Sequence, residues 1–175
     1  MSGLTFSPTI ERSVVVEACR VVKRLDRESL MRIAVDRGCR HYAPLLSTPL
    51  SGSVERADLP HEVLGAALLR GLRDGETFQA IRCGAMVLSD LGNDPETILS
   101  AADYYGVADR LAHIARMGFE FDDHPGYWEA LLSLALPSPE EAAFLPGLSR
   151  LTSETRMTKM GRHPVRTWLR TRWPR

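Results

Sequence analysis

The sequence predicts an all-α protein: a compact multi-helix bundle or a short stack of helical hairpins, with about seven helices and a basic C-terminal extension. Apolar residues recur at three- and four-residue spacing along most of the chain, which is the period of an amphipathic helix. Proline, glycine and capping residues divide this pattern into segments joined by short connectors, and short connectors favour antiparallel neighbours. We therefore expect a helical domain over residues 1–150 and a tail rich in tryptophan and arginine over residues 151–175.

Two helices are expected at the N-terminus. Ser7-Pro8 can open the first, with Ser7 as N-cap and Pro8 in the first turn. Asp26 can cap the second, and Gly38 can end it in a left-handed conformation. Spacing predicts that one face of the first helix points inward, and this face comprises Ile10, Val14, Ala18, Val21, Val22 and Leu25.

Residues 39–60 predict a long loop, since Pro44, Pro49, Gly52 and Pro60 interrupt any regular pattern. Loops of this length inside a compact domain often carry function.

Five further helices are expected, over residues 62–73, 76–91, 94–105, 107–117 and 124–136. Asp94-Pro95-Glu96 supplies an N-cap, a first-turn proline and a first-turn acid. Gly106 and Gly118 read as helix ends, whereas Gly84 lies mid-helix and indicates close helix packing. Ser138-Pro139-Glu140-Glu141 is a capping box that predicts one more short helix.

Charge is strongly segregated along this electrically neutral chain. The net charge is +3 over residues 1–54, −10 over residues 55–149 and +7 over residues 150–175. Tryptophan and arginine are enriched at binding hot spots. We therefore expect the tail to contact an acidic protein surface, either on its own body or on another chain, through Arg162, Arg166, Trp168, Arg170, Arg172 and Trp173.

Composition predicts a cytoplasmic protein. The three cysteines, Cys19, Cys39 and Cys83, are widely spaced and odd in number, which fits buried thiols in a reducing compartment. The N-terminus shows no secretory signal pattern, and the apolar runs are too short for a membrane span.

The segment from Ala101 to Val107 resembles the first half of a helix-turn-helix, with Ala102 as the small packing residue and Gly106-Val107 as the turn. The following helix departs from that pattern, because its large apolar residues fall one position early. Arg110 and Arg116 could reach phosphate from its exposed face. The acidic surroundings oppose DNA, so we expect ordinary helix packing here.

Chemical motifs are sparse. His113, Asp122, Asp123 and His124 lack the spacing of a zinc site, and Cys39 and His41 lack an orienting third group for a nucleophile pair. We therefore expect no catalytic residue, no metal and no cofactor.

The extreme C-terminus is similar to the arginine-rich transport signals of type IV secretion substrates. The matching residues lie within the last fourteen and are Arg162, Arg166, Arg170, Arg172 and Arg175. This resemblance implies a secreted substrate and assigns no family.

These observations predict a non-enzymatic protein–protein interaction module, a subunit or accessory factor of a larger assembly. The alternatives are a nucleic-acid-associated protein that binds phosphate through its tail, and the secreted substrate. A helical enzyme that uses His113 or the acidic pair at positions 122–123 is the remaining class.

Overall fold

The computed structural model describes residues 9–39, 42–43, 46, 59–70, 78–122, 124–134 and 136–137. Over these residues the protein is all-helical, as the sequence predicts, with seven helices and no strand. The helices are α1 (Arg12–Val22), α2 (Arg27–Asp36), α3 (His61–Leu69), α4 (Phe78–Leu88), α5 (Pro95–Tyr105), α6 (Ala108–Phe121) and α7 (Pro125–Leu132).

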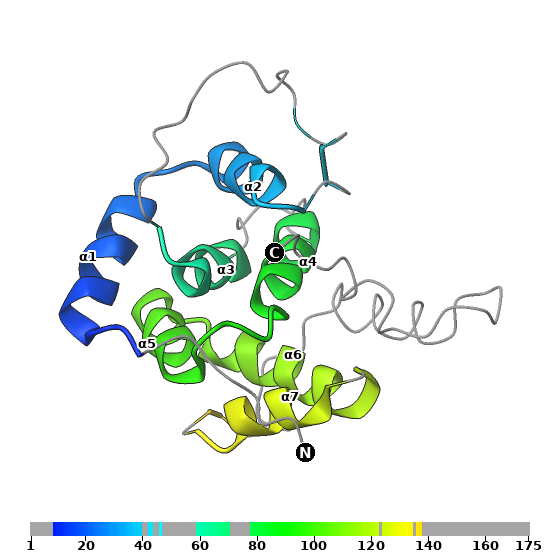
Figure 1. Cartoon of the computed structure of the whole chain (residues 1–175). Coiled ribbons are helices and arrows are strands. Elements are labelled where there is room, and N and C mark those ends of the chain that lie inside the picture. The colour runs from blue at the N-terminus through cyan, green and yellow to red at the C-terminus, as the bar shows by residue number, and fades with distance from the viewer. Residues whose placement is uncertain are drawn as a thin grey trace, which may run out of the picture.

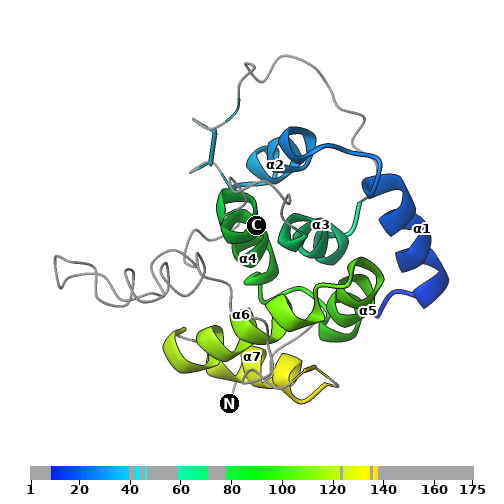
Figure 2. The ribbon, with the colours of Figure 1, turned by 180° about the vertical axis from the view of Figure 1, so that it is seen from behind.

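Helix α3 lies at the centre of the arrangement (Figure 1). It packs against α1, α2, α4 and α5, while α6 and α7 pair at the base of the molecule. The view from behind shows the same central position (Figure 2). Every residue of α3 from Glu62 to Leu69 is buried, which explains why its sequence is almost uniformly apolar.

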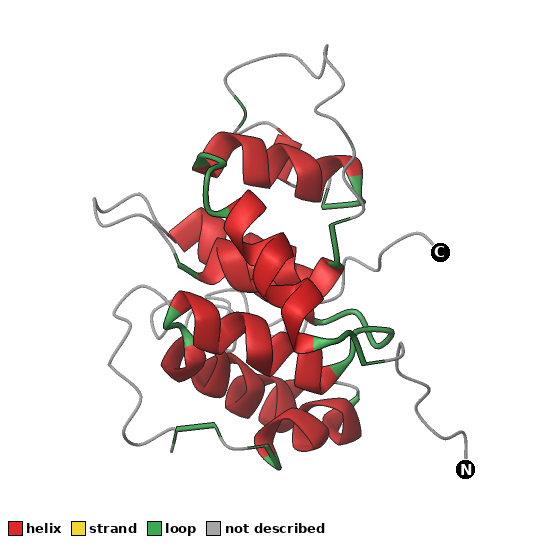
Figure 3. Ribbon diagram, turned by 90° about the vertical axis from the view of Figure 1, so that its left-hand side faces the viewer, coloured by secondary structure: helices red, strands yellow, loops and turns green. Residues whose placement is uncertain are grey.

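The helices stack from α2 at the top to α7 at the bottom (Figure 3). Two apolar clusters fill this stack. The upper one joins helices α1 to α5, and the lower one joins helices α3 to α7. Helix α3 contributes to both, since Leu68 belongs to the upper cluster and Leu69 to the lower. The two clusters therefore share helices α3, α4 and α5.

Close packing of α3 on α4 depends on two glycines. A Cβ atom at Gly84 would lie 2.8 Å from the Gly65 carbonyl oxygen and 2.9 Å from the Leu68 Cβ. A Cβ atom at Gly65 would lie 2.5 Å from Leu88 Cδ2. The prediction that Gly84 marks close helix packing is therefore confirmed.

Several helix ends follow the sequence. The Asp26 carboxylate accepts a hydrogen bond from the Ser29 backbone N–H at 2.7 Å, and so caps α2. Gly38 follows α2 with φ of 122°, and Gly106 ends α5 with φ of 65°, the left-handed region that favours glycine. Asp94 caps α5, with Pro95 in its first turn.

Other predicted boundaries are wrong. Helix α1 begins at Arg12 rather than at Pro8, and α3 ends at Leu69, short of residue 73. Helix α7 ends at Leu132, before the predicted residue 136. The Ser138 capping box and most of the predicted 39–60 loop lie outside the described residues.

Gly118 does not end α6, which continues to Phe121. A Cβ atom at Gly118 would lie 2.6 Å from the Trp128 Nε1 atom, and it would lie closer still to the ring carbons. Glycine is therefore needed here for the contact between α6 and α7. Gly118 is a packing glycine and not the capping glycine that the sequence predicted.

Candidate interaction surface

The tail residues predicted to bind a partner lie outside the described residues. They are Arg162, Arg166, Trp168, Arg170, Arg172 and Trp173. Among the described residues, the candidate surface lies on α1.

Helix α1 exposes apolar side chains that the sequence pattern placed inside. Val14 keeps 51% of its surface exposed and Val21 keeps 48%, whereas Val15, Cys19 and Val22 are fully buried. The prediction that Val14 and Val21 face inward is therefore wrong. The residue after each of them, Val15 and Val22, is buried instead. Since α1 is apolar over a wider arc than its neighbours cover, its spacing could not show which part of the arc faces the core.

The exposed valines belong to a row that we call the α1 stripe: Val14, Ala18 and Val21 on α1, and Leu25 just beyond its C-terminal end. Val14 and Val21 are separated by two helical turns, about 10 Å along the axis. Ala18 and Leu25 are half-buried and pack on the upper cluster. The stripe is thus continuous with the core on one side and open to solvent on the other.

Cations gather at the C-terminal end of the stripe. Arg20 in the last turn of α1 and Lys23 and Arg24 just after it are all exposed and lie within three residues of Val21 in the sequence. Arg20 forms an exposed salt bridge with Glu17 at 3.2 Å, an arrangement that contributes little to stability. This end of the stripe is an apolar centre with a basic rim.

Polar contacts hold α1 firmly against α5. The Tyr105 hydroxyl donates to the Cys19 carbonyl oxygen at 3.1 Å. The backbone N–H of Ile10 donates to the Thr97 hydroxyl at 3.2 Å, and the Thr9 hydroxyl donates to Asp94 at 3.2 Å. The stripe therefore lies on a helix that is tied to the body at both ends.

The most polar buried site joins the starts of α3 and α5. Asp94 accepts hydrogen bonds from the Thr97 N–H at 2.9 Å and the Thr97 hydroxyl at 2.6 Å. Glu62 accepts a hydrogen bond from the Asp94 backbone N–H at 3.0 Å. Asn93 donates to the Val87 carbonyl oxygen at 2.9 Å. These polar groups bond to helix ends and to one another, which is a structural role. Sequence reasoning found the Asp94 cap and missed Glu62, whose only sequence signal is its place in a first turn.

The helix-turn-helix resemblance is ordinary helix packing. Leu111 and Ile114 are buried, and Ala102 is buried beneath the turn. Arg110 donates to the carbonyl oxygens of Leu69 and Arg70, and so caps the end of α3. The proposed phosphate contact from Arg110 conflicts with this geometry, whereas Arg116 is exposed.

The suggested metal and nucleophile residues have other surroundings. Asp122 accepts the Trp128 indole N–H at 2.6 Å, and the N-cap residue of α7, His124, makes no side-chain capping bond. Burial lowers the pKa of His113. Within the described ranges, no group of three or more His, Cys, Asp or Glu side chains could hold a metal ion. His41 and Asp123 lie outside those ranges.

Comparisons with models of protein families, with curated proteins and with solved structures found no match to this chain. In the part of the chain that the structure describes, no helix is long and apolar enough to cross a membrane.

Proposed function

We propose that this protein is a non-catalytic protein–protein interaction module, a subunit or accessory factor of a larger cytoplasmic assembly, and that the α1 stripe is one of its contact surfaces. The observation that carries the proposal is the pair of half-exposed valines, Val14 and Val21, on an anchored helix. Interfaces combine an apolar centre with a polar rim, and this surface has both parts.

The spacing of the stripe suits a helical partner. Its three residues on α1 follow one another at intervals of four and three, which is the spacing of the seam between two packed helices. A partner helix with a matching apolar row would bury Val14 and Val21. We therefore propose an amphipathic helix of another protein as the occupant.

The partner helix would be acidic. Arg20, Lys23 and Arg24 favour carboxylates beside the apolar row. The chain's own tail has the wrong sign for this place, because its last twenty residues hold seven basic residues and no acidic one. Cationic side chains are also favourable at the C-terminal end of a helix that binds no partner. The exposed valines therefore support the proposed interface more strongly than the basic residues do.

The basic tail is a second proposed contact. Its arginines and tryptophans would bind an acidic protein surface, either on another chain or on the body, where Glu96, Asp103 and Glu129 are exposed. Nucleic acid is the alternative ligand of the tail, and a steep loss of binding with added salt distinguishes it.

Affinity capture with matched variants tests the proposal. The full chain, a chain without residues 156–175 and a Val14→Ser/Val21→Ser double variant are each used to capture proteins from the source cells. Phe119→Ser is the control, because Phe119 is 37% exposed on α6, away from the stripe. We expect a partner that the control retains and the double variant loses. Equal capture by all variants would contradict the α1 surface, and loss on tail deletion would assign the contact to the tail.

A further inference from the structure

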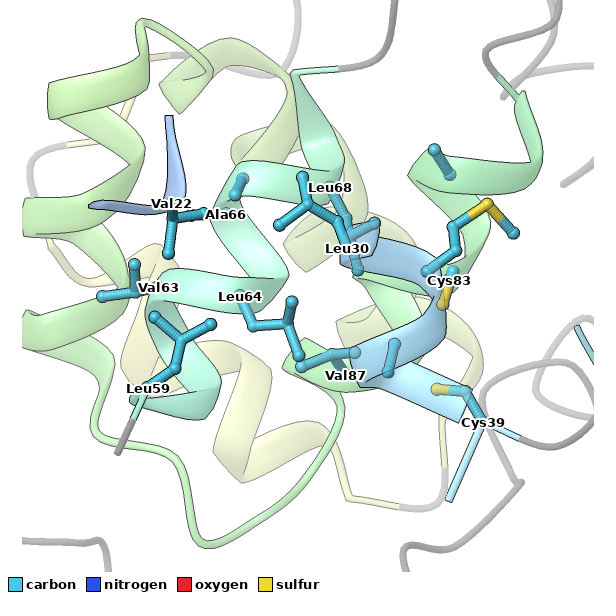
Figure 4. Close-up of a cluster of buried hydrophobic side chains, with 14 of the residues drawn as sticks. Val22, Leu30, Cys39, Leu59, Val63, Leu64, Ala66, Leu68, Cys83 and Val87 are labelled. Carbon is cyan, nitrogen blue, oxygen red and sulfur yellow. The ribbon is translucent and has the colours of Figure 1, made fainter. Parts of the chain in front are cut away.

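Two of the three cysteines lie together in the upper cluster. Cys39 directly follows Gly38 at the end of α2, and Cys83 lies within α4. Both thiols are free and fully buried. Figure 4 shows both side chains among the buried residues between α2 and α4. Chain segments that are far apart in sequence thus bring two sulfur atoms into one small volume.

The two thiols interact directly. A hydrogen bond with the Cys39 thiol, together with burial and the neighbouring Cys39 charge, raises the pKa of Cys83. The Tyr42 side chain is buried beside them, and burial and the charge of Cys83 raise its pKa as well. The site therefore comprises two thiols and a phenol in apolar surroundings.

Metal binding does not suit this site. Zinc usually takes four protein ligands in a structural site, and two thiols supply half of that number. Covalent bond formation between the sulfurs is the chemistry that such a pair offers.

We propose that Cys39 and Cys83 are a dithiol–disulfide pair that an oxidised thiol, such as glutathione disulfide, closes. One sulfur attacks the glutathione disulfide and releases one glutathione, and the second sulfur then displaces the other glutathione from the mixed disulfide. One S–S bond forms between the cysteines and one breaks in the oxidant. Two electrons and two protons pass from the cysteines to give two glutathione molecules.

Cys39 lies in the segment that leaves the end of α2. Gly38 has φ of 122°, and Cys39 lies outside the regular part of α2. Closure brings the sulfurs to the bond length of about 2.05 Å. The resulting ring contains the whole of α3, so the bond would restrict the unfolded chain and stabilise the fold.

Burial makes the reaction slow. Attack requires a thiolate, and the raised pKa of Cys83 keeps that thiol protonated while it is packed. Local opening at the end of α2 is needed before the oxidant reaches either sulfur. The test must therefore be run to equilibrium.

Cys19 provides a matched control within the chain. It is fully buried in α1, and its side-chain neighbour is the phenol of Tyr105. A general effect of oxidant on buried thiols would involve Cys19 as well.

The experiment equilibrates the full-length protein without oxygen in buffers that range from reduced to oxidised glutathione. Free thiols are then alkylated, and the protein is analysed by intact mass and by peptide mapping. In oxidised buffer we expect a loss of two hydrogen atoms, a peptide linking Cys39 to Cys83, and alkylated Cys19. The thermal midpoint should rise by roughly 5 °C or more over that of the reduced protein.

Two sets of samples keep the result interpretable. Cys19→Ala should retain the link, and Cys39→Ala and Cys83→Ala should each lose it. Protein oxidised in denaturant should give mixed pairings, which shows that the fold selects the pair. The proposal is overturned if Cys39 and Cys83 remain alkylated after equilibration in oxidised buffer. Links to Cys19 in comparable amount from the folded protein would overturn it equally.

Discussion

The indole ring of Trp128 occupies the space that a side chain would need at Gly118. Trp128 is fully buried, and its indole N–H donates to Asp122 at 2.6 Å, so the ring is held in place. This contact sets how closely α6 approaches α7. The lower half of the molecule therefore depends on the absence of a side chain at one position.

Gly118→Ala should destabilise the protein by about 1–3 kcal/mol, because the added methyl group overlaps a ring that has little freedom to move. Urea denaturation followed by circular dichroism measures the change. Gly92→Ala is the control, since its Cβ would lie an ordinary 3.4 Å from Asp90 Oδ1. We expect the control to stay within about 0.5 kcal/mol of the wild type. Equal effects of the two variants would contradict this description of the contact between α6 and α7.

Glu62→Ala should lower the free energy of unfolding by about 1–3 kcal/mol, because it leaves the buried Asp94 N–H without its acceptor. Glu62→Gln keeps an acceptor oxygen and should cost less. Chemical denaturation of both variants checks the order. If the glutamine variant is as unstable as the alanine variant, the carboxylate has a role beyond accepting this bond.

Arg110→Ala should destabilise the end of α3 by about 1–3 kcal/mol, because two carbonyl oxygens lose their donor. Arg116→Ala, at an exposed position of the same helix, should have little effect. Thermal unfolding distinguishes the two. A stable Arg110→Ala protein would show that this arginine is available for an external ligand after all.

Stability should fall as the pH drops below about 6.5, the ordinary pKa of histidine. Burial lowers the pKa of both His61 and His113, and Arg37 contributes at His61. Below 6.5 the unfolded chain takes up protons that the folded chain resists, and the loss continues until the pH reaches the lowered pKa values. His113→Gln should flatten this pH profile, whereas His124→Gln, at an exposed position, serves as the control. Parallel profiles for all three proteins would contradict the assignment.

The sequence predicted those parts of the fold that depend on local chemistry. Asp26 and Asp94 cap helices through their own side chains, and Gly38 and Gly106 end helices through a conformation that glycine favours. Such signals lie within a few residues of the feature they specify, so spacing and residue type suffice to find them.

Contacts between distant segments were beyond the reach of the sequence pattern. Glu62 reaches Asp94 only after α3 has packed on α5, and Cys39 meets Cys83 only after α2 has packed on α4. The exposure of Val14 and Val21 depends on how α1 is rotated against α3 and α5. Helical spacing identifies an apolar arc, but the neighbours decide which part of it they cover.

The candidate interaction surface also depends on contacts between distant segments, which the sequence pattern did not predict. The sequence drew attention to the charged tail, which lies outside the described residues, and assigned the α1 stripe to the core. Where neighbouring positions are also valine, residue type alone does not show which valine is exposed. The width of the apolar arc could have indicated an exposed valine on this helix, because Val14, Val15 and Val16 cannot all face one core.

The most direct test of the account is the affinity of the captured partner for the purified protein, measured by titration calorimetry. Val14 and Val21 are each about half exposed, so replacing them with serine removes apolar surface from the proposed interface. The substitutions leave the fully buried residues of the core intact. We predict at least a tenfold weaker Kd for the double variant, about 1.4 kcal/mol, with unchanged unfolding and with wild-type affinity for Phe119→Ser. Equal Kd values for the wild type and the double variant would show that the α1 stripe is not the binding surface.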